Sequence, residues 1–253
     1  MDDLQLHMIS NLRPHSATNW RIKIRVTRMW QHMNGNAEIV GMSFIFADAL
    51  GQRIQASVPA ACLQQFENLL IEGETYDVHR FVVMQYPPMK KFICFENDIY
   101  IQLNHMTEIF VTEGVEFIPA QVFDFTDLSG LMEATTENKY LIDVVGILQQ
   151  VGPITEFTNR RNQQQSAIHF RITDLHDSAQ VVLHNDLAHN FNTQIQNAVR
   201  HPIIVIIASC RVHLDQGEPK LTNFPATRVF INHDHEAVGD LRDALRLANW
   251  VHN

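Results

Sequence analysis

The sequence predicts an all-β protein with short helices, in which two tandem five-stranded barrels are joined by a linker and followed by a C-terminal helix. One series of local signals occurs twice, and in each copy apolar and polar residues alternate as they do in strands. The two copies keep their register, because Asp48 and Asp174 are almost as far apart in sequence as Phe66 and Phe191. Such a regular recurrence indicates a duplicated domain.

The first copy of the series opens with the alternating segment Trp20-Arg-Ile-Lys-Ile-Arg-Val26. A polar loop around Asn34-Gly35-Asn36 separates its first two strands, and a short helix that ends at Phe66 follows the third. The expected strands occupy residues 20–26, 43–48, 53–58, 75–84, 92–95 and 99–103.

The second copy opens with Tyr140-Leu-Ile-Asp-Val-Val-Gly-Ile147, and its polar loop contains Asn159-Arg-Arg-Asn162. A short helix ends at Phe191, and residues 236–251 carry apolar side chains at helical spacing. That last segment predicts a helix that closes the second barrel. The expected strands of this copy occupy residues 140–147, 169–174, 180–183, 202–212 and 228–231.

Strand, strand, strand, short helix, strand, strand is the order of the oligonucleotide/oligosaccharide-binding (OB) barrel. OB barrels commonly bind single-stranded nucleic acid. A chain of 253 residues has room for two of them. We therefore expect an N-terminal lead-in at 1–19, a first OB-fold domain at 20–112, an acidic connector at 113–139, and a second OB-fold domain with the helix at 140–253.

The net charge of −9 argues at first against a nucleic-acid binder. Much of the negative charge, however, lies in the connector, where Lys139 is the only basic residue between 113 and 139. Six acidic residues accompany it, namely Glu113, Glu116, Asp124, Asp127, Glu133 and Glu137. Each barrel is thus near neutral and can hold a local basic groove, although the overall charge favours modest affinity.

Composition and motifs exclude several other classes of protein. The N-terminus carries Asp2 and Asp3 and lacks the apolar core of a signal peptide, and no apolar run is long enough to span a membrane. The three cysteines show no CxxC spacing, so we expect a reducing compartment, no metal and no cofactor. No nucleophile elbow, P-loop or dinucleotide glycine pattern is present, so we expect no catalytic residues and no enzyme.

The connector carries a more specific signal. Phe123-Asp-Phe-Thr126, then Leu128 and Leu131, precede the strand Tyr140–Ile147, which contains Ile142-Asp-Val-Val-Gly146. This arrangement resembles the linker between the two central OB domains of the replication protein A large subunit. The second barrel continues the resemblance through Asp174, Val181-Val-Leu183, Ala188 and Phe191, and the first barrel, with Trp20 to Arg28 and Trp30, resembles the plant-type expanded branch of that family.

The resemblance implies a non-catalytic, largely sequence-independent single-stranded DNA-binding protein. It would act in DNA replication, repair, recombination or telomere maintenance, in the nucleus, with possible protein partners in DNA maintenance but no membrane and no small-molecule substrate. Two departures matter. His184 stands where the family carries a base-stacking Trp, which predicts that the second barrel binds weakly. The chain also shows no counterpart of the zinc-bearing third OB domain, through which the smaller subunits of that family assemble.

Candidate binding residues in the first barrel combine cations for phosphates with rings for bases. Arg25 shares the polar face of the first strand, whose simpler interpretation is a solvated surface. Arg28 and Trp30 follow it, in the loop that clamps ligand in OB domains. A late hairpin interleaves the two residue types. It contributes Arg80, Phe81, Tyr86, Lys90, Lys91 and Phe92.

Candidates in the second barrel are fewer and mostly basic. Arg160 and Arg161 lie in its long polar loop, and Arg171 alternates with core residues of a strand. His184 occupies the family's stacking position, and Arg211, His213 and Lys220 flank the next hairpin.

Two other interpretations stay open. The barrels can serve as an adaptor for protein partners with little or no nucleic-acid binding, which the overall acidity and His184 favour. RNA can also replace DNA as the ligand, because OB grooves contact backbone and base faces that both share.

Overall fold

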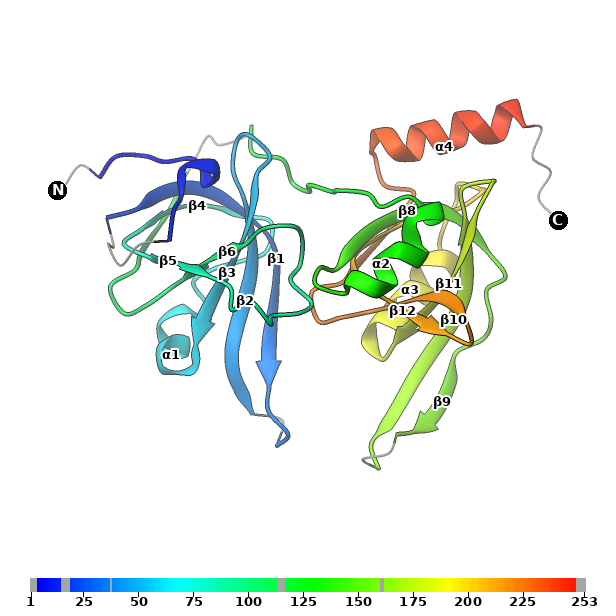
Figure 1. The fold of residues 1–253 in the computed structure, drawn as a ribbon, viewed down its shortest axis with the longest axis horizontal. Helices are drawn as coiled ribbons and strands as arrows, with labels where there is room; N and C mark the ends of the chain where they lie inside the picture. Colours follow the sequence, from blue (N-terminus) through cyan, green and yellow to red (C-terminus); the bar gives the residue numbers. More distant parts are fainter. Residues whose placement is uncertain (1–3, 15–18, 37, 113–116, 160–161, 249–253) are drawn as a thin grey trace. The chain divides into compact units, whose positions relative to one another are not determined.

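The computed structural model describes residues 4–14, 19–36, 38–112, 117–159 and 162–248. The chain forms two compact units (Figure 1). The first unit comprises Met1–Lys90 and Glu96–Val122, and the second unit comprises Lys91–Phe95 and Phe123–Asn253. The short segment Lys91–Phe95 therefore interrupts the first unit in sequence but belongs to the second.

The first unit is one sheet that closes on itself. β1 pairs antiparallel with β2 and β4, while β3 is antiparallel to β2 and parallel to β6, which in turn pairs with β5. β4 and β5 are two parts of the strand predicted over 75–84, interrupted at Arg80, whose φ is 59°. The elements are η1 (Ile9–Asn11), β1 (Arg21–Met33), β2 (Ile39–Ala47), β3 (Arg53–Pro59), η2 (Ala60–Cys62), α1 (Leu63–Phe66), β4 (Thr75–His79), β5 (Val82–Gln85), β6 (Ile99–Gln102) and β7 (Glu108–Val111).

The second unit repeats this pairing. β8 is antiparallel to β10 and β12, while β11 is antiparallel to β10 and parallel to β13, which pairs with β12. The parallel pair β11–β13 corresponds to β3–β6 of the first unit. The elements are η3 (Leu128–Gly130), α2 (Leu131–Glu137), β8 (Ile142–Gln149), β9 (Thr155–Thr158), β10 (Gln164–Thr173), β11 (Ser178–His184), α3 (Asp186–Gln196), β12 (Ile204–Asp215), β13 (Glu218–Thr222), β14 (Arg228–Ile231) and α4 (Glu236–Leu247).

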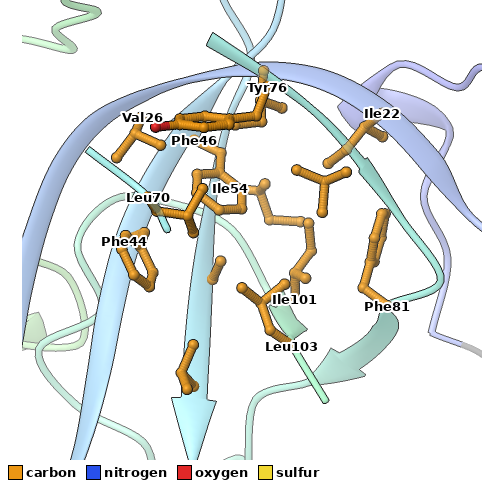
Figure 2. Packing of buried hydrophobic residues seen from close by; sticks show 14 of the residues in the cluster. Ile22, Val26, Phe44, Phe46, Ile54, Leu70, Tyr76, Phe81, Ile101 and Leu103 are labelled. Atoms are coloured by element: carbon orange, nitrogen blue, oxygen red, sulfur yellow. The ribbon is translucent and has the colours of Figure 1, made fainter. Parts of the chain in front are cut away.

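Both units thus have the strand order of the OB barrel, and the predicted fold class is confirmed, including the C-terminal helix α4. Inward-facing side chains fill the first barrel, where Phe44 and Phe46 of β2 lie with ring centroids 5.8 Å apart (Figure 2). Ile9 and Leu12 of the lead-in are buried in the same core. The lead-in is therefore part of the folded unit.

The repeated signals that revealed the duplication are structural. The Asp48 carboxylate accepts the backbone N–H groups of Leu50 and Gln52, both at 3.0 Å, and so closes the turn between β2 and β3. Asp174 makes the equivalent bonds after β10, where its carboxylate accepts two N–H groups of the next turn. Asp is favoured in such turns because its short side chain reaches the backbone two residues on.

The connector motif is structural as well. Phe123 and Phe125 pack against the apolar side chains between α4 and the sheet, with ring centroids 5.5 Å apart. The buried carboxylate of Asp143 accepts the backbone N–H of Asp124 at 3.0 Å and that of Ser209 at 2.7 Å. These bonds hold the connector against the second barrel.

Three strand predictions need correction. Residues 92–95 form no strand, because Phe92 has a φ of 58°, and only Ile93 makes an isolated bridge, to Tyr140. The fifth strand of the second barrel is β13, whose Glu218-Pro219-Lys220 start hid it from the sequence pattern. The segment predicted as the last barrel strand is instead β14, an added strand that pairs with β12.

Candidate nucleic-acid interface

The outer face of an OB barrel over its second and third strands, with the loops beside it, is the usual surface for oligonucleotides. In the first unit this face lies on β1, β2 and β3. A bulge after Val26 changes the register of β1, and Trp30 then pairs with Ser43 of β2. His32, Ser43 and Gln55 lie on the side of these strands that faces away from the core.

Polar contacts connect these strands across the face. His32 Nε2 lies 2.7 Å from Ser43 Oγ, and Gln55 Nε2 donates to the same oxygen at 3.4 Å. The hydroxyl of Tyr86 donates to Gln55 Oε1 at 2.9 Å, and its ring stacks on that of Tyr100 at 4.7 Å. The first unit therefore presents rings and amides that suit nucleobases better than phosphates.

Lys90 supplies the positive charge near this face. Partial burial, and then the charge of Lys90, lower the pKa of His32 below its ordinary value. Trp30 is only 8% exposed, and its ring lies edge-on to that of His32, with centroids 6.2 Å apart. Trp30 therefore lies on the same side as Ser43 but exposes little of its own surface for stacking.

Four residues predicted for the first barrel's interface lie elsewhere. Phe81 is fully buried in the core (Figure 2), and Arg28 is 1% exposed. Arg25 donates to the carbonyl oxygens of Ile118 and Gly73, at 3.0 and 2.6 Å, and so fastens the chain after β7. Arg80 forms an ion pair with Glu108 at 3.5 Å, at the end of β1 opposite to Trp30.

The second unit has a different outer face, on which basic side chains of β10, β12 and β13 lie in two rows of cross-strand partners that pass through β11. In the first row, Arg171 of β10, Gln180 of β11, Lys220 of β13 and His213 of β12 are successive cross-strand partners. In the second row the partners are His169, Val182, Thr222 and Arg211. We call this surface the cationic face.

The alternation of side chains along each strand explains these rows. Successive side chains of a strand point to opposite faces, and the intervening residues Phe170, Val181, Leu221 and Val212 all lie in the core. Neighbouring strands are about 4.8 Å apart, so these side chains lie close together on one surface. Arg171, Arg211 and Lys220 are thus brought together, as the sequence could not show.

Local contacts orient the cations without neutralising the whole face. Arg171 Nη2 donates to Ser178 Oγ at 2.7 Å, and Lys220 Nζ lies 2.6 Å from the half-exposed carboxylate of Asp215. Burial is the main cause that lowers the pKa of His213, followed by the charges of Arg211 and Lys220. Burial likewise lowers the pKa of His184, followed by His169 and Lys220. Both imidazoles are therefore neutral at pH 7.

Aromatic rings flank the cationic face. Phe157 of β9 is 42% exposed, and its ring centroid lies 6.4 Å from that of His184. The guanidinium of Arg211 lies 4.8 Å from the ring centroid of Phe92, which also contacts Phe224 at 5.7 Å. Phe92 was predicted for the first barrel and belongs to the second unit, as does the exposed Lys91.

Sequence reasoning missed several members of these faces, namely His32, Gln55, Tyr100, Phe157, His169 and Phe224. The alternation of side chains along the strand could have predicted His169, because it lies two residues before Arg171 and therefore on the same face. Arg160 and Arg161 lie outside the described residues. Where the structure describes the chain, no group of three or more His, Cys, Asp or Glu side chains is placed to hold a metal, and no helix is long and apolar enough to cross a membrane.

Comparison with known proteins identifies relatives for the whole chain. Residues 10–134 match the family described as "Domain of unknown function DUF223". A replication protein A 70 kDa DNA-binding subunit of Arabidopsis thaliana is 28% identical over 255 residues, which cover 97% of this chain and 40% of that protein. A replication protein A 70 kDa DNA-binding subunit of Oryza sativa subsp. japonica is 26% identical, over 97% of this chain and 38% of that protein.

The chain is thus similar, over almost its whole length, to large subunits of replication protein A. It spans about two fifths of the length of these relatives. A solved structure of a replication protein A heterotrimer bound to single-stranded DNA has the same fold, with a TM-score of 0.63 and 22% identity over 95% of this chain and 55% of that one. These similarities confirm the resemblance drawn from the connector motif.

Proposed function

We propose that this chain is a non-catalytic protein that binds single-stranded DNA with little sequence preference. The observation that carries the proposal is the cationic face, which aligns Arg171, Arg211 and Lys220 across four strands of an OB barrel. Cations in such an array contact successive phosphates, and phosphate contacts carry no sequence information. The similarity to replication protein A subunits, which are named "DNA-binding subunit", supports the same function.

The two barrels would contribute different contacts. The first unit offers stacked rings and amide groups through Tyr86, Tyr100 and Gln55, with Lys90 beside them. The second unit offers cations, flanked by Phe92 and Phe157. Stacking contributes about 1–3 kcal/mol per base, whereas the cations contribute a salt-dependent term. Binding by the second barrel then needs no Trp at position 184.

The proposed setting is DNA replication, repair, recombination or telomere maintenance in the nucleus, with protein partners from the same processes. These statements rest on the family. Because the chain spans a minor part of its relatives' length, assembly with other subunits is a proposal and not a finding.

Fluorescence anisotropy tests the proposal, with a labelled mixed-sequence DNA strand of about 30 nucleotides, long enough for two OB barrels. We expect saturable binding that prefers the single strand over duplex and weakens steeply with salt. Replacement of Arg171, Arg211 and Lys220 together by Ala should reduce the slope of log K against log salt by about 2, because each single-strand phosphate contact contributes about 0.7.

Arg13→Ala is the matched control, because Arg13 is exposed in the first unit and donates to the nearby carbonyl oxygens of Ser10 and Leu12. Its salt slope should equal that of the unmodified protein. Absence of saturable binding at low salt would contradict the proposal and favour the adaptor interpretation. Equal affinity for RNA and DNA strands would extend the ligand to both.

A further inference from the structure

Three arginines from two separate segments surround one pocket of the second unit. Arg200 and His201 precede β12, whereas Arg242 and Arg246 lie one turn apart near the end of α4. Pro202 and Leu245 complete the lining. In a chain with a net charge of −9, three guanidinium groups around one hollow repel one another unless an anion offsets their charge.

Asn232, directly after β14, holds the two segments together. Its Nδ2 donates to the carbonyl oxygen of Arg200 at 2.8 Å, and its Oδ1 accepts from Nη2 of Arg242. Nη1 of Arg242 donates to the carbonyl oxygen of Pro202 at 3.2 Å. The backbone of Arg200 and the guanidinium of Arg242 are thus fixed relative to each other, so the pocket is a built feature of the fold.

Arg242 is the buried member of the group, with 7% of its surface exposed. Its Nη atoms have backbone and amide acceptors, but its Nε has no hydrogen-bond acceptor among the described residues. Burial, and then the charges of Arg200 and Arg246, lower the pKa of this guanidinium below its ordinary value. A buried cation whose Nε–H has no hydrogen-bond acceptor lowers the stability of the folded protein. A bound oxyanion would supply both a compensating negative charge and the acceptor.

Asp243 lies beside Arg246. Its carboxylate is 3.0 Å from Nη1 of Arg246, and both side chains are about three-quarters exposed, so water and salt screen this pair. Arg200 is also exposed. Two exposed arginine side chains and one fixed guanidinium therefore remain available to a ligand that enters from solvent.

We propose that this pocket binds a phosphate monoester. A monoester carries nearly two negative charges at pH 7 and three terminal oxygens, which match three converging guanidinium groups better than a diester with one charge. The site is separate from the cationic face. α4 covers Ile204 and Ile206 in the first half of β12, whereas Arg211 and His213 lie in its second half.

Isothermal titration calorimetry of the whole chain with phenyl phosphate tests the proposal, with diphenyl phosphate as the diester and a fixed ionic strength. We expect saturable binding of the monoester and much weaker binding of the diester. Arg200→Ala and Arg246→Ala should each weaken monoester binding at least about tenfold, because each removes a charge-assisted contact. Arg13→Ala should leave it unchanged.

Arg200 and Arg246 are exposed, so their variants should unfold at the temperature of the unmodified protein, which separates lost binding from lost folding. Three outcomes would overturn the proposal. They are the absence of saturable heat with phenyl phosphate, equal binding by Arg200→Ala and Arg246→Ala, and equal affinity for the diester. Single-stranded DNA affinity should stay unchanged in both variants, and a parallel loss would instead assign the pocket to DNA.

Discussion

Gly146 of β8 lies against Ile172 of β10 so closely that a Cβ atom on Gly146 would be 2.9 Å from the Cβ of Ile172. The backbone nitrogen and oxygen of Thr173 would each be 3.3 Å away. Neither Cβ nor backbone can yield without a shift of the sheet. This contact gives a physical reason for the glycine of the Ile142-Asp-Val-Val-Gly146 strand.

We therefore expect Gly146→Ala to lower the free energy of unfolding of the second unit by about 1–3 kcal/mol, the usual cost of overpacking. Gly239→Ala is the matched control. Gly239 lies within α4 with open space around it, so Ala there should raise stability by about 0.5–1 kcal/mol. Urea denaturation measures both changes. A Gly146→Ala variant as stable as the unmodified protein would refute the close contact.

Removal of the Asp143 carboxylate should also destabilise the second unit. In Asp143→Ala, the buried N–H groups of Ser209 and Asp124 lose their acceptor, and each unsatisfied group costs about 1–3 kcal/mol. Asp240→Ala, which removes an exposed carboxylate on α4, should change stability by less than about 0.5 kcal/mol. Thermal unfolding of the two variants provides the comparison, and similar midpoints would show that Asp143 does not anchor the connector.

In the first unit, Lys90 and Arg80 should differ in their effect on DNA binding. Lys90 lies near His32 on the outer face, whereas Arg80 pairs with Glu108 at the far end of β1. We expect Lys90→Ala to weaken single-stranded DNA binding about two- to fivefold at low salt, as for one phosphate contact. Arg80→Ala should have no measurable effect. Anisotropy titrations measure both affinities. A larger loss of affinity in Arg80→Ala than in Lys90→Ala would place the binding surface at the Arg80 end of the barrel instead.

Binding of single-stranded DNA should tighten as pH falls from about 7.5 to 5.5, because imidazoles on the cationic face gain a proton and a positive charge. The pKa values of His184 and His213 are lowered in the folded protein, so the unfolded chain binds protons more readily. Stability of the free protein should accordingly fall as pH drops below 6.5, the ordinary value, towards the lowered values.

DNA should oppose that loss, since a bound phosphate favours the protonated imidazole. The variant with both His184 and His213 changed to Gln should bind with an affinity that changes much less between the two pH values. His176→Gln, an exposed histidine of the β10–β11 turn, is the matched control. An unmodified protein whose DNA affinity does not depend on pH would show that these imidazoles do not face the ligand.

The duplicated strand order could be predicted because local signals encode it. Asp48 and Asp174 close equivalent turns with their own carboxylates, and core residues alternate along β1 up to Val26 and along β10 from Ile168 to Ile172. β13 escaped prediction because only Leu221 faces the core and a proline precedes it. Barrel closure by tertiary pairing, not local preference, makes this segment a strand.

The binding faces could be predicted only in part. Arg171, Lys220 and Arg211 were recognisable as surface cations, but their alignment depends on a parallel pairing between β11 and β13 that no local pattern reveals. Phe81 was wrongly predicted to lie at the surface. An aromatic residue next to an arginine is typical of a nucleic-acid-binding surface, but an aromatic residue in a strand is equally typical of a buried core. The bulge after Val26 pairs Arg28 with Ile45 instead of continuing the alternation, and no local pattern announces that Arg28 is buried there.

The segment Lys91–Phe95 has a consequence for how the protein can be divided. Because it belongs to the second unit while Glu96–Val122 returns to the first, no single cut of the polypeptide yields two complete units. Leu141 N donates to the carbonyl oxygen of Ile93 at 2.7 Å, and a fragment that starts at residue 113 would lose this partner. Exchange of one barrel between relatives, in evolution or in the laboratory, must therefore carry this five-residue insert along with the barrel it completes.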